Sequence, residues 1–195
     1  MCIRDRSTGK RTSLPDFADA VEAVGRATGG PCALVAHSMG AAASAAAVRA
    51  GLPVTRAVLL APPADPRVVL QGFGDFLRLP PAALQHMVRR FEEARGEPLS
   101  HYCVPDFAPS LRAEARVFHD RADREVPFAA GAAIARAWPG AQLIPTEGLG
   151  HNRLLYAPEV VAPAVAFLAE GHPERAPLHA HVPPAARKHA PGASA

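Results

Sequence analysis

The sequence has few cysteines and no long hydrophobic run. The three cysteines are Cys2, Cys32 and Cys103, and their spacing matches neither a disulfide framework nor a zinc cluster. A reducing, cytoplasmic location is therefore the expectation. No apolar run reaches the roughly 18 residues that span a bilayer, because the Ala-rich stretch 41–48 ends at Arg49. We expect no membrane span.

Lysine is almost absent, and the charges nearly balance. The chain has 21 basic and 18 acidic residues, a formal net charge of +3, and its lysines are Lys10 and Lys188. The basic residues are scattered, and no segment combines them with aromatic side chains, which argues against a nucleic-acid partner. A hydrophobic content of 49% fits one soluble domain with a substantial core.

The two ends of the chain differ from the segment between them. Residues 1–6, Met-Cys-Ile-Arg-Asp-Arg, resemble the translated end of a transposon adapter used to make sequencing libraries. We interpret them as an artefact, expect the natural N-terminus to be missing, and infer nothing from the lack of a signal peptide. Residues 171–195 are rich in His, Pro and Ala without apolar periodicity, which predicts a disordered tail without a metal site.

Between these ends, helical and strand patterns alternate, which predicts an α/β fold with a mainly parallel sheet. Short apolar runs predict four strands, and the first two have the composition of strands buried on both faces. Apolar residues at helical spacing predict the helices around them. The predicted strands are Cys32–Val35, Ala57–Leu60, Ala115–Phe118 and Gln142–Pro145, and helices are expected near 15–29, 128–138 and 158–170.

The segment 34–43, Leu-Val-Ala-His-Ser-Met-Gly-Ala-Ala-Ala, runs from a predicted strand through Ser38 into a helix of small residues. Two positions before and after the serine lie Ala36 and Gly40, which are small enough for strand and helix to approach closely. This pattern predicts a nucleophile elbow, a tight turn that holds a serine in a strained backbone conformation. Ser38 is therefore the candidate nucleophile, and an ordinary helix N-cap is the alternative.

This segment resembles the strand-His-Ser-Met/Leu-Gly-Gly elbow of the α/β-hydrolase superfamily, and the resemblance extends from about residue 7 to 167. Segment 119–127 resembles the DxxVP loop of that family, which assigns the acid to Asp123. Segment 148–155 resembles its GxGHxxxL loop, which assigns the base to His151. The resemblance implies the C-terminal part of an α/β-hydrolase fold at 7–170, holding the last four of eight strands.

A serine, an acid and a histidine in this order imply a serine hydrolase that needs neither cofactor nor metal. The backbone N–H of Met39 is the expected oxyanion donor. The second donor normally comes from an early His-Gly loop, which is missing from this chain. Asp65 and Asp120 remain alternatives to Asp123, and Asp120 better fits a role in supporting the loop by hydrogen bonds.

Other histidines near the predicted site have ordinary explanations. His37 and His119 end predicted strands, so we expect them to be packed and hydrogen-bonded. His86 and His101 fall in the Pro-rich segment 62–112, which predicts an inserted lid with helices near 68–77 and 82–95, and we expect both to be solvated. Apolar side chains of this lid could line an acyl pocket or form the core of the lid, and both interpretations stay open. They are Phe73, Phe76, Leu77, Leu84, Met87 and Phe91.

The implied reaction is hydrolysis of a small-molecule ester or thioester through an acyl-enzyme on Ser38. A perhydrolase or haloperoxidase relative is one alternative, and a non-catalytic binding protein of the same fold is another. The identity of the acyl group and the oligomeric state cannot be read from the sequence. Without an earlier strand, Cys32–Val35 becomes an apolar sheet edge, so we expect the 195-residue chain to aggregate and to show little activity.

Overall fold

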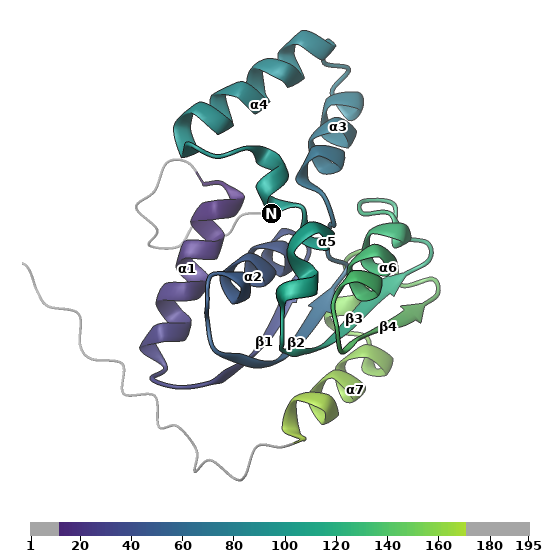
Figure 1. The fold of residues 1–195 in the computed structure, drawn as a ribbon. Coiled ribbons are helices and arrows are strands. Elements are labelled where there is room, and N and C mark those ends of the chain that lie inside the picture. Colours follow the sequence, from purple (N-terminus) through teal and green to yellow (C-terminus); the bar gives the residue numbers. More distant parts are fainter. Residues whose placement is uncertain (1–11, 171–195) are drawn as a thin grey trace, which may run out of the picture.

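The structure is a computed structural model that describes residues 12–170. The predictions for the adapter-like segment 1–6 and for the tail 171–195, including its histidines, lie outside these residues. Within the described range, four strands alternate with helices, as the hydrophobic pattern predicted (Figure 1). No helix in this range is both long enough and apolar enough to cross a membrane.

The four strands form one parallel sheet whose spatial order, β1-β2-β3-β4, equals their order in the sequence. This arrangement confirms the predicted parallel α/β layer. Each strand extends slightly beyond the apolar run that predicted it. The strands are β1 (Cys32–His37), β2 (Val54–Leu60), β3 (Glu114–Asp120) and β4 (Ala141–Thr146).

Helices cover both faces of the sheet, and the two faces hold separate hydrophobic clusters. Leu59 and Val117 point into the cluster shared with α2 (Met39–Arg49) and α6 (Phe128–Ala137). Val58 and Phe118 point to the opposite face, where α7 (Pro158–Ala169) packs. Side chains of successive strand residues alternate between the faces, so β2 and β3 each contribute buried side chains to both clusters.

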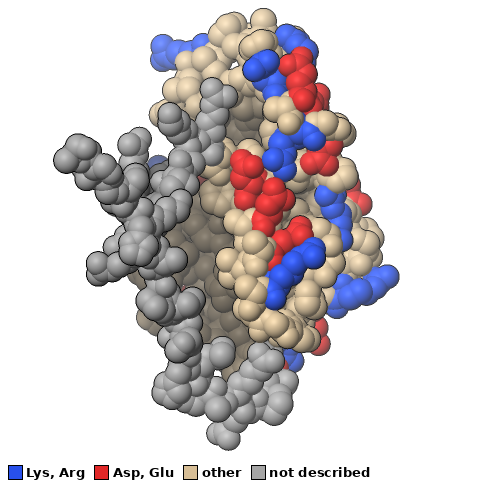
Figure 2. Space-filling model, turned by 90° about the vertical axis from the view of Figure 1, so that its left-hand side faces the viewer, with Lys and Arg blue, Asp and Glu red and all other residues tan. Residues whose placement is uncertain are grey.

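The N-terminal helix α1 (Leu14–Ala27) packs on α2 and not directly on the sheet. It begins with a capping box, in which the backbone N–H of Ser13 donates to the carboxylate of Asp16 at 2.7 Å. Figure 2 shows the face of the molecule that includes this side, where basic and acidic side chains alternate along one column. In α1, Asp16 also forms an ion pair with Arg95 at 3.2 Å.

Strand β1 differs from the expectation that it is buried on both faces. It lies at the edge of the described sheet, its residues are only partly buried, and the side chain of Val35 is 58% exposed. Helix α7 packs over β2 and β3, and within residues 12–170 no element covers Val35. The apolar composition of β1 therefore overstated its burial, because composition does not show how far the covering layer extends.

The segment predicted as a lid contains two longer helices and three short ones. The longer helices, α3 (Pro66–Phe76) and α4 (Pro81–Arg95), lie together at one end of the molecule, away from the sheet (Figure 1). The short helices that follow are η1 (Leu99–Tyr102), α5 (Val104–Phe107) and η2 (Ala108–Ser110). The end of the segment belongs to the main core, because Val104, Ala108 and Leu111 are buried in the cluster beside the sheet.

Candidate active site

Ser38 occupies the turn between β1 and α2, with a φ of 54° and a ψ of −129°. Few non-glycine residues adopt such a backbone, and here hydrogen bonds on both sides hold it in place. The N–H of Ser38 donates to the carbonyl of Leu60 at 2.9 Å, and its own carbonyl accepts from Ala41 at 2.9 Å. The side chain makes no capping hydrogen bond to α2. Ser38 thus stands at the N-cap position of α2 without capping the helix through its side chain, and the hydroxyl is free to face another group.

The sequence pattern implied that only a very small residue fits at position 40, but the structure leaves room there. A Cβ atom built on Gly40 would meet no described atom within 4 Å. The close approach of strand and helix that the elbow pattern suggested at this position is therefore not found among residues 12–170. Ser38 itself shows the positive φ that the elbow requires.

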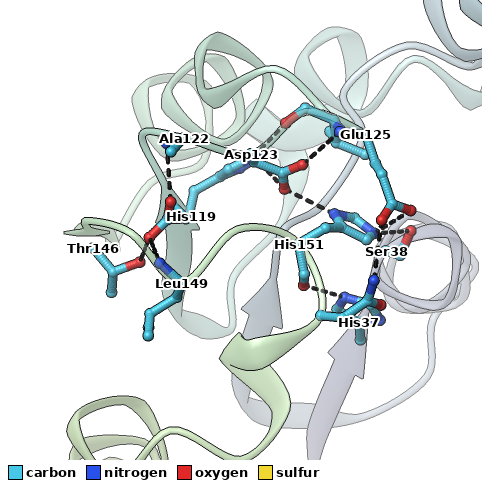
Figure 3. A network of polar contacts seen from close by, with 12 residues as sticks. His37, Ser38, His119, Ala122, Asp123, Glu125, Thr146, Leu149 and His151 are labelled. Carbon is cyan, nitrogen blue, oxygen red and sulfur yellow. Dashed lines mark hydrogen bonds and ion pairs between the residues drawn. The ribbon is translucent and has the colours of Figure 1, made fainter.

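The imidazole of His151 lies between Ser38 and Asp123 (Figure 3). Its Nε2 is 3.0 Å from the Oγ of Ser38, and its Nδ1 is 2.8 Å from the Oδ2 of Asp123. Both distances are hydrogen-bond distances, so the three predicted residues meet although they are 113 and 28 positions apart. Only 5% of the His151 side chain and none of the Asp123 side chain is exposed.

The acid loop after β3 fixes the carboxylate of Asp123. Its Oδ1 accepts from the backbone N–H groups of Glu125 at 2.8 Å and Val126 at 2.9 Å. Its Oδ2 is therefore left to face Nδ1 of His151. A carboxylate in this position selects the histidine tautomer with a proton on Nδ1, which leaves Nε2 free to accept the proton of Ser38.

The two alternative acids have other partners. Asp65 caps α3, accepting from the N–H of Arg67 at 2.8 Å and pairing with its guanidinium at 2.7 Å. Asp120 is fully buried and accepts from Ala122, Thr146 and Leu149 at 2.8 to 2.9 Å. Burial alone would raise the pKa of Asp120, but these hydrogen bonds hold it below its ordinary value. Asp120 thus supports the loops as the sequence suggested.

Two glycines shape the loop that carries His151. Gly148 has a φ of 75° and Gly150 a φ of 65°, in the left-handed region that glycine adopts at little cost. Between them, the N–H of Leu149 donates to Asp120. The loop therefore leaves β4, is tied to the end of β3, and returns His151 to the serine.

Both histidines that end strands are packed and hydrogen-bonded, as expected. Nε2 of His37 lies 3.0 Å from the carbonyl oxygen of His151, and the two rings are 4.6 Å apart between centroids. His119 is fully buried, with Nε2 2.9 Å from the carbonyl of Val126 and 3.5 Å from Oδ2 of Asp123. Burial lowers the pKa of both imidazoles. In the lid, His86 and His101 are exposed.

A comparison of the sequence with models of protein families identifies the family of this chain. A model of the alpha/beta hydrolase family matches residues 4–164. The chain belongs to the alpha/beta hydrolase family. A comparison with curated protein sequences finds no match.

Solved structures share the fold of this alpha/beta hydrolase at low identity. An esterase from Rhodococcus sp. ECU1013 is 19% identical, with a TM-score of 0.57 over 85% of this chain and 77% of that chain. A thermophilic esterase from Thermogutta terrifontis is 18% identical, with a TM-score of 0.55 over 80% and 71%. An N-acyl homoserine lactone degrading enzyme is 18% identical, with a TM-score of 0.59 over 84% and 77%.

A cavity of about 400 Å³ opens beside Ser38, between the body of the hydrolase and its lid helices. Its wall is apolar apart from the hydroxyls of Ser13 and Ser38. Three of the lid side chains singled out in the sequence line it, whereas Leu84 is buried against Gly74 and the other two, Phe76 and Leu77, are exposed. Some of the six side chains therefore line a pocket, and Leu84 belongs to the core of the lid. The three lining side chains are Phe73, Met87 and Phe91.

A second cavity of about 860 Å³ adjoins the first and has a different chemistry. Phe73 and Val126 contribute to the walls of both. The second cavity lies between α3 and the start of α6, and charged side chains of Asp65, Arg124 and Glu125 stand at its rim. The site therefore offers an apolar space beside the serine and, beside the acid loop, a second space whose mostly apolar wall also carries charged side chains.

Sequence patterns did not identify Glu125 as a residue of the site. Its Oε2 is 3.9 Å from Nε2 of His151, and its Oε1 accepts from Nδ2 of Asn152 at 3.0 Å. The DxxVP pattern leaves this position open, and the contact depends on a loop 27 residues further along the chain. Among the described residues, no group of three or more His, Cys, Asp or Glu side chains could hold a metal ion.

Proposed function

We propose that the protein is a serine hydrolase that cleaves an ester or thioester through an acyl-enzyme on Ser38. His151 is the base and Asp123 the acid of the proposed triad. The observation that supports this most directly is the continuous chain of contacts from Ser38 Oγ through both nitrogens of His151 to Asp123 Oδ2. A serine hydroxyl becomes an effective nucleophile when an oriented imidazole can accept its proton.

The proposed reaction proceeds in two halves. Nε2 of His151 takes the proton of Ser38 as Oγ attacks the carbonyl carbon, and then gives that proton to the departing alcohol or thiol. Water attacks the acyl-enzyme with His151 again as base, which releases the acid and restores Ser38. Asp123 stabilises the imidazolium in both halves and keeps the ring in place.

The start of α2 supplies one proposed oxyanion donor. Met39 is the first residue of this helix, directly after Ser38, and the N–H groups of a helix's first turn have no partner within the helix. The N–H of Met39 is therefore available to the negative charge that develops on the carbonyl oxygen. A family member of this kind normally uses a second donor as well.

The apolar cavity beside Ser38 supports an apolar acyl group as the part of the substrate that it holds. Its wall carries no charged side chain, so an acyl chain or ring would gain from leaving water there and a charged one would be desolvated without a partner. Phe73 from α3 and Phe91 from α4 narrow this space from the lid side.

The test is covalent labelling with a fluorophosphonate probe, which needs an activated serine but no turnover. We expect one adduct per chain, located on Ser38 by mass spectrometry of the digested protein. Ser38→Ala should abolish the adduct, and Ser110→Ala is the matched control, because Ser110 is exposed and its hydroxyl only donates to the carbonyl of Phe107.

The rival function is a non-catalytic member of the fold that binds a small molecule. A folded protein, verified by circular dichroism and cooperative unfolding, that takes up no probe on Ser38 would favour this rival. Labelling that persists at the same rate in Asp123→Asn and in His151→Gln would also contradict the proposal, because the serine would then be reacting without the other two members.

A further inference from the structure

Glu125 places a second carboxylate at the reacting edge of His151. Its Oε2 is 3.9 Å from Nε2, the atom that also contacts Ser38, and Figure 3 shows its side chain reaching over the ring on that side. The Glu125 side chain is 61% exposed, so its carboxylate remains in contact with solvent. Asn152 holds its other oxygen at 3.0 Å, which keeps the charge over the site.

The geometry of the proposed reaction sets which part of a substrate meets this charge. Nε2 of His151 must reach the leaving atom to protonate it, so that atom lies within about 3 Å of Nε2 in the transition state. A substituent on the leaving group then lies near the Glu125 carboxylate, whose Oε2 is 3.9 Å from the same nitrogen. In the proposed function, the acyl group occupies the apolar cavity beside Ser38.

We propose that Glu125 is a specificity-determining residue that selects leaving groups by charge, favouring cationic and neutral alcohols over those with an anion close to the scissile bond. This inference rests on the proposed function. The leaving group would occupy the cavity whose rim carries Glu125.

Of the charged side chains that line the second cavity, Glu125 is the one with a contact to His151 among residues 12–170. Asp65, on the same rim, is paired with Arg67 at 2.7 Å. Arg124 also lines the cavity and bears the opposite charge. The carboxylate of Glu125 lies 3.9 Å from Nε2 of His151, whereas that of Asp123 contacts the other ring nitrogen, Nδ1, at 2.8 Å.

The experiment compares three butanoate esters of similar shape and different charge. Their alcohols are choline, 3,3-dimethylbutanol and isethionate, so a trimethylammonium, a tert-butyl or a sulfonate group lies two carbons from the ester oxygen. We expect kcat/KM to decrease in that order. The ratio of choline ester to isethionate ester should be about tenfold in low salt and should shrink as salt screens the carboxylate.

Glu125→Gln removes the charge but keeps an oxygen that can accept from Asn152. It should reduce the choline-to-isethionate ratio by about tenfold, and Asn152→Ala should reduce the ratio by less. The matched control is Glu147→Gln, which changes the net charge equally at an 84% exposed side chain outside both cavities, and it should leave the ratio unchanged.

The outcomes separate this inference from the proposed function. Cleavage of all three esters by a protein that labels on Ser38, with a ratio that Glu125→Gln does not change, would overturn the role of Glu125 alone. An equal change in Glu147→Gln would also overturn it, because net charge would then explain the effect. Absence of both labelling and cleavage in a folded protein would instead overturn the proposed function.

Discussion

The backbone N–H of Leu149 donates to the buried carboxylate of Asp120 at 2.9 Å, and this bond joins the loop that carries His151 to the loop that carries Asp123. Thr146, at the end of β4, donates to the same oxygen at 2.8 Å, and Ala122 donates to the other oxygen at 2.9 Å. One side chain thus satisfies three donors at the carboxyl ends of β3 and β4, where open α/β sheets place their sites.

Replacing Asp120 should therefore destabilise the protein even though this residue is not proposed to react. Asp120→Ala leaves three donors without their acceptor, and each unsatisfied buried group costs about 1 to 3 kcal/mol. We expect a loss of about 3 kcal/mol or more in the free energy of unfolding, measured by urea denaturation. Asp120→Asn keeps one acceptor oxygen and should lose less. An Ala variant as stable as the unmodified protein would show that these contacts contribute little.

Gly131 in α6 leaves room for His119. A Cβ atom at this position would lie 2.4 Å from Nδ1 of that buried ring, which cannot move without losing its contact to Val126. Gly131→Ala should therefore lower the free energy of unfolding by about 1 to 3 kcal/mol, despite the higher helix propensity of alanine.

Gly72 in α3 is the matched control for Gly131. A Cβ atom there would meet no described atom within 4 Å, so Gly72→Ala should stabilise the helix by up to about 1 kcal/mol. In thermal and urea unfolding, we expect Gly131→Ala to lower the free energy of unfolding and Gly72→Ala to raise it. If both variants gain stability, the packing between His119 and α6 is looser than these distances indicate.

Stability should depend on pH through His119. Burial lowers the pKa of its imidazole below the ordinary value of 6.5, and its Nδ1 has no hydrogen-bond partner among the described residues. Below pH 6.5 the unfolded chain binds a proton that the folded chain does not, so the free energy of unfolding falls as the pH falls. This contribution is complete above 6.5 and decreases down to the pKa of the folded state.

The measurement is urea denaturation at a series of pH values below 7. We expect His119 to contribute a slope of up to about 1.4 kcal/mol per pH unit. His119→Gln retains a donor for Val126 and should remove that part of the slope. His37, whose pKa burial also lowers, acts in the same direction but is only half-buried, so His37→Gln should change the slope less. An identical slope in His119→Gln would contradict the assignment.

Local pattern was sufficient for the strands. Val58 and Leu59 are almost completely buried in β2, as an apolar run bounded by proline predicts, and the four strands pair in the order in which they follow in the chain. The loops around Asp123 and His151 come directly after β3 and β4, so they lie at the carboxyl ends of these strands. The strands and the loops that follow them depend on residues close together in the sequence, so a short segment is enough to predict each one.

What the sequence left open depends on contacts between distant segments. Phe73 and Phe76 lie on one helix three positions apart, yet the first lines the cavity beside Ser38, whereas the second is 83% exposed and lines only the adjoining cavity. Only the position of α4 and the body of the protein decides between them. The direction of Glu125 depends in the same way on Asn152, and the exposure of Val35 depends on how far α7 reaches.

The exposed strand β1 leads to the last prediction, which concerns the 195-residue chain in solution. Within residues 12–170, β1 pairs with β2 on one side only, and its apolar Val35 is 58% exposed. Such an edge offers unpaired backbone groups and apolar side chains to a second copy, and β1 contains no lysine or proline to oppose pairing. We expect concentration-dependent self-association in size-exclusion chromatography with light scattering. Val35→Lys should reduce it, because a charge in an edge strand opposes pairing. Val161→Lys changes an exposed apolar residue on α7 in the same way and should not reduce it. A monomeric, cooperatively unfolding 195-residue protein would contradict the argument, and equal rescue by both lysines would show that net charge and not the β1 edge controls association.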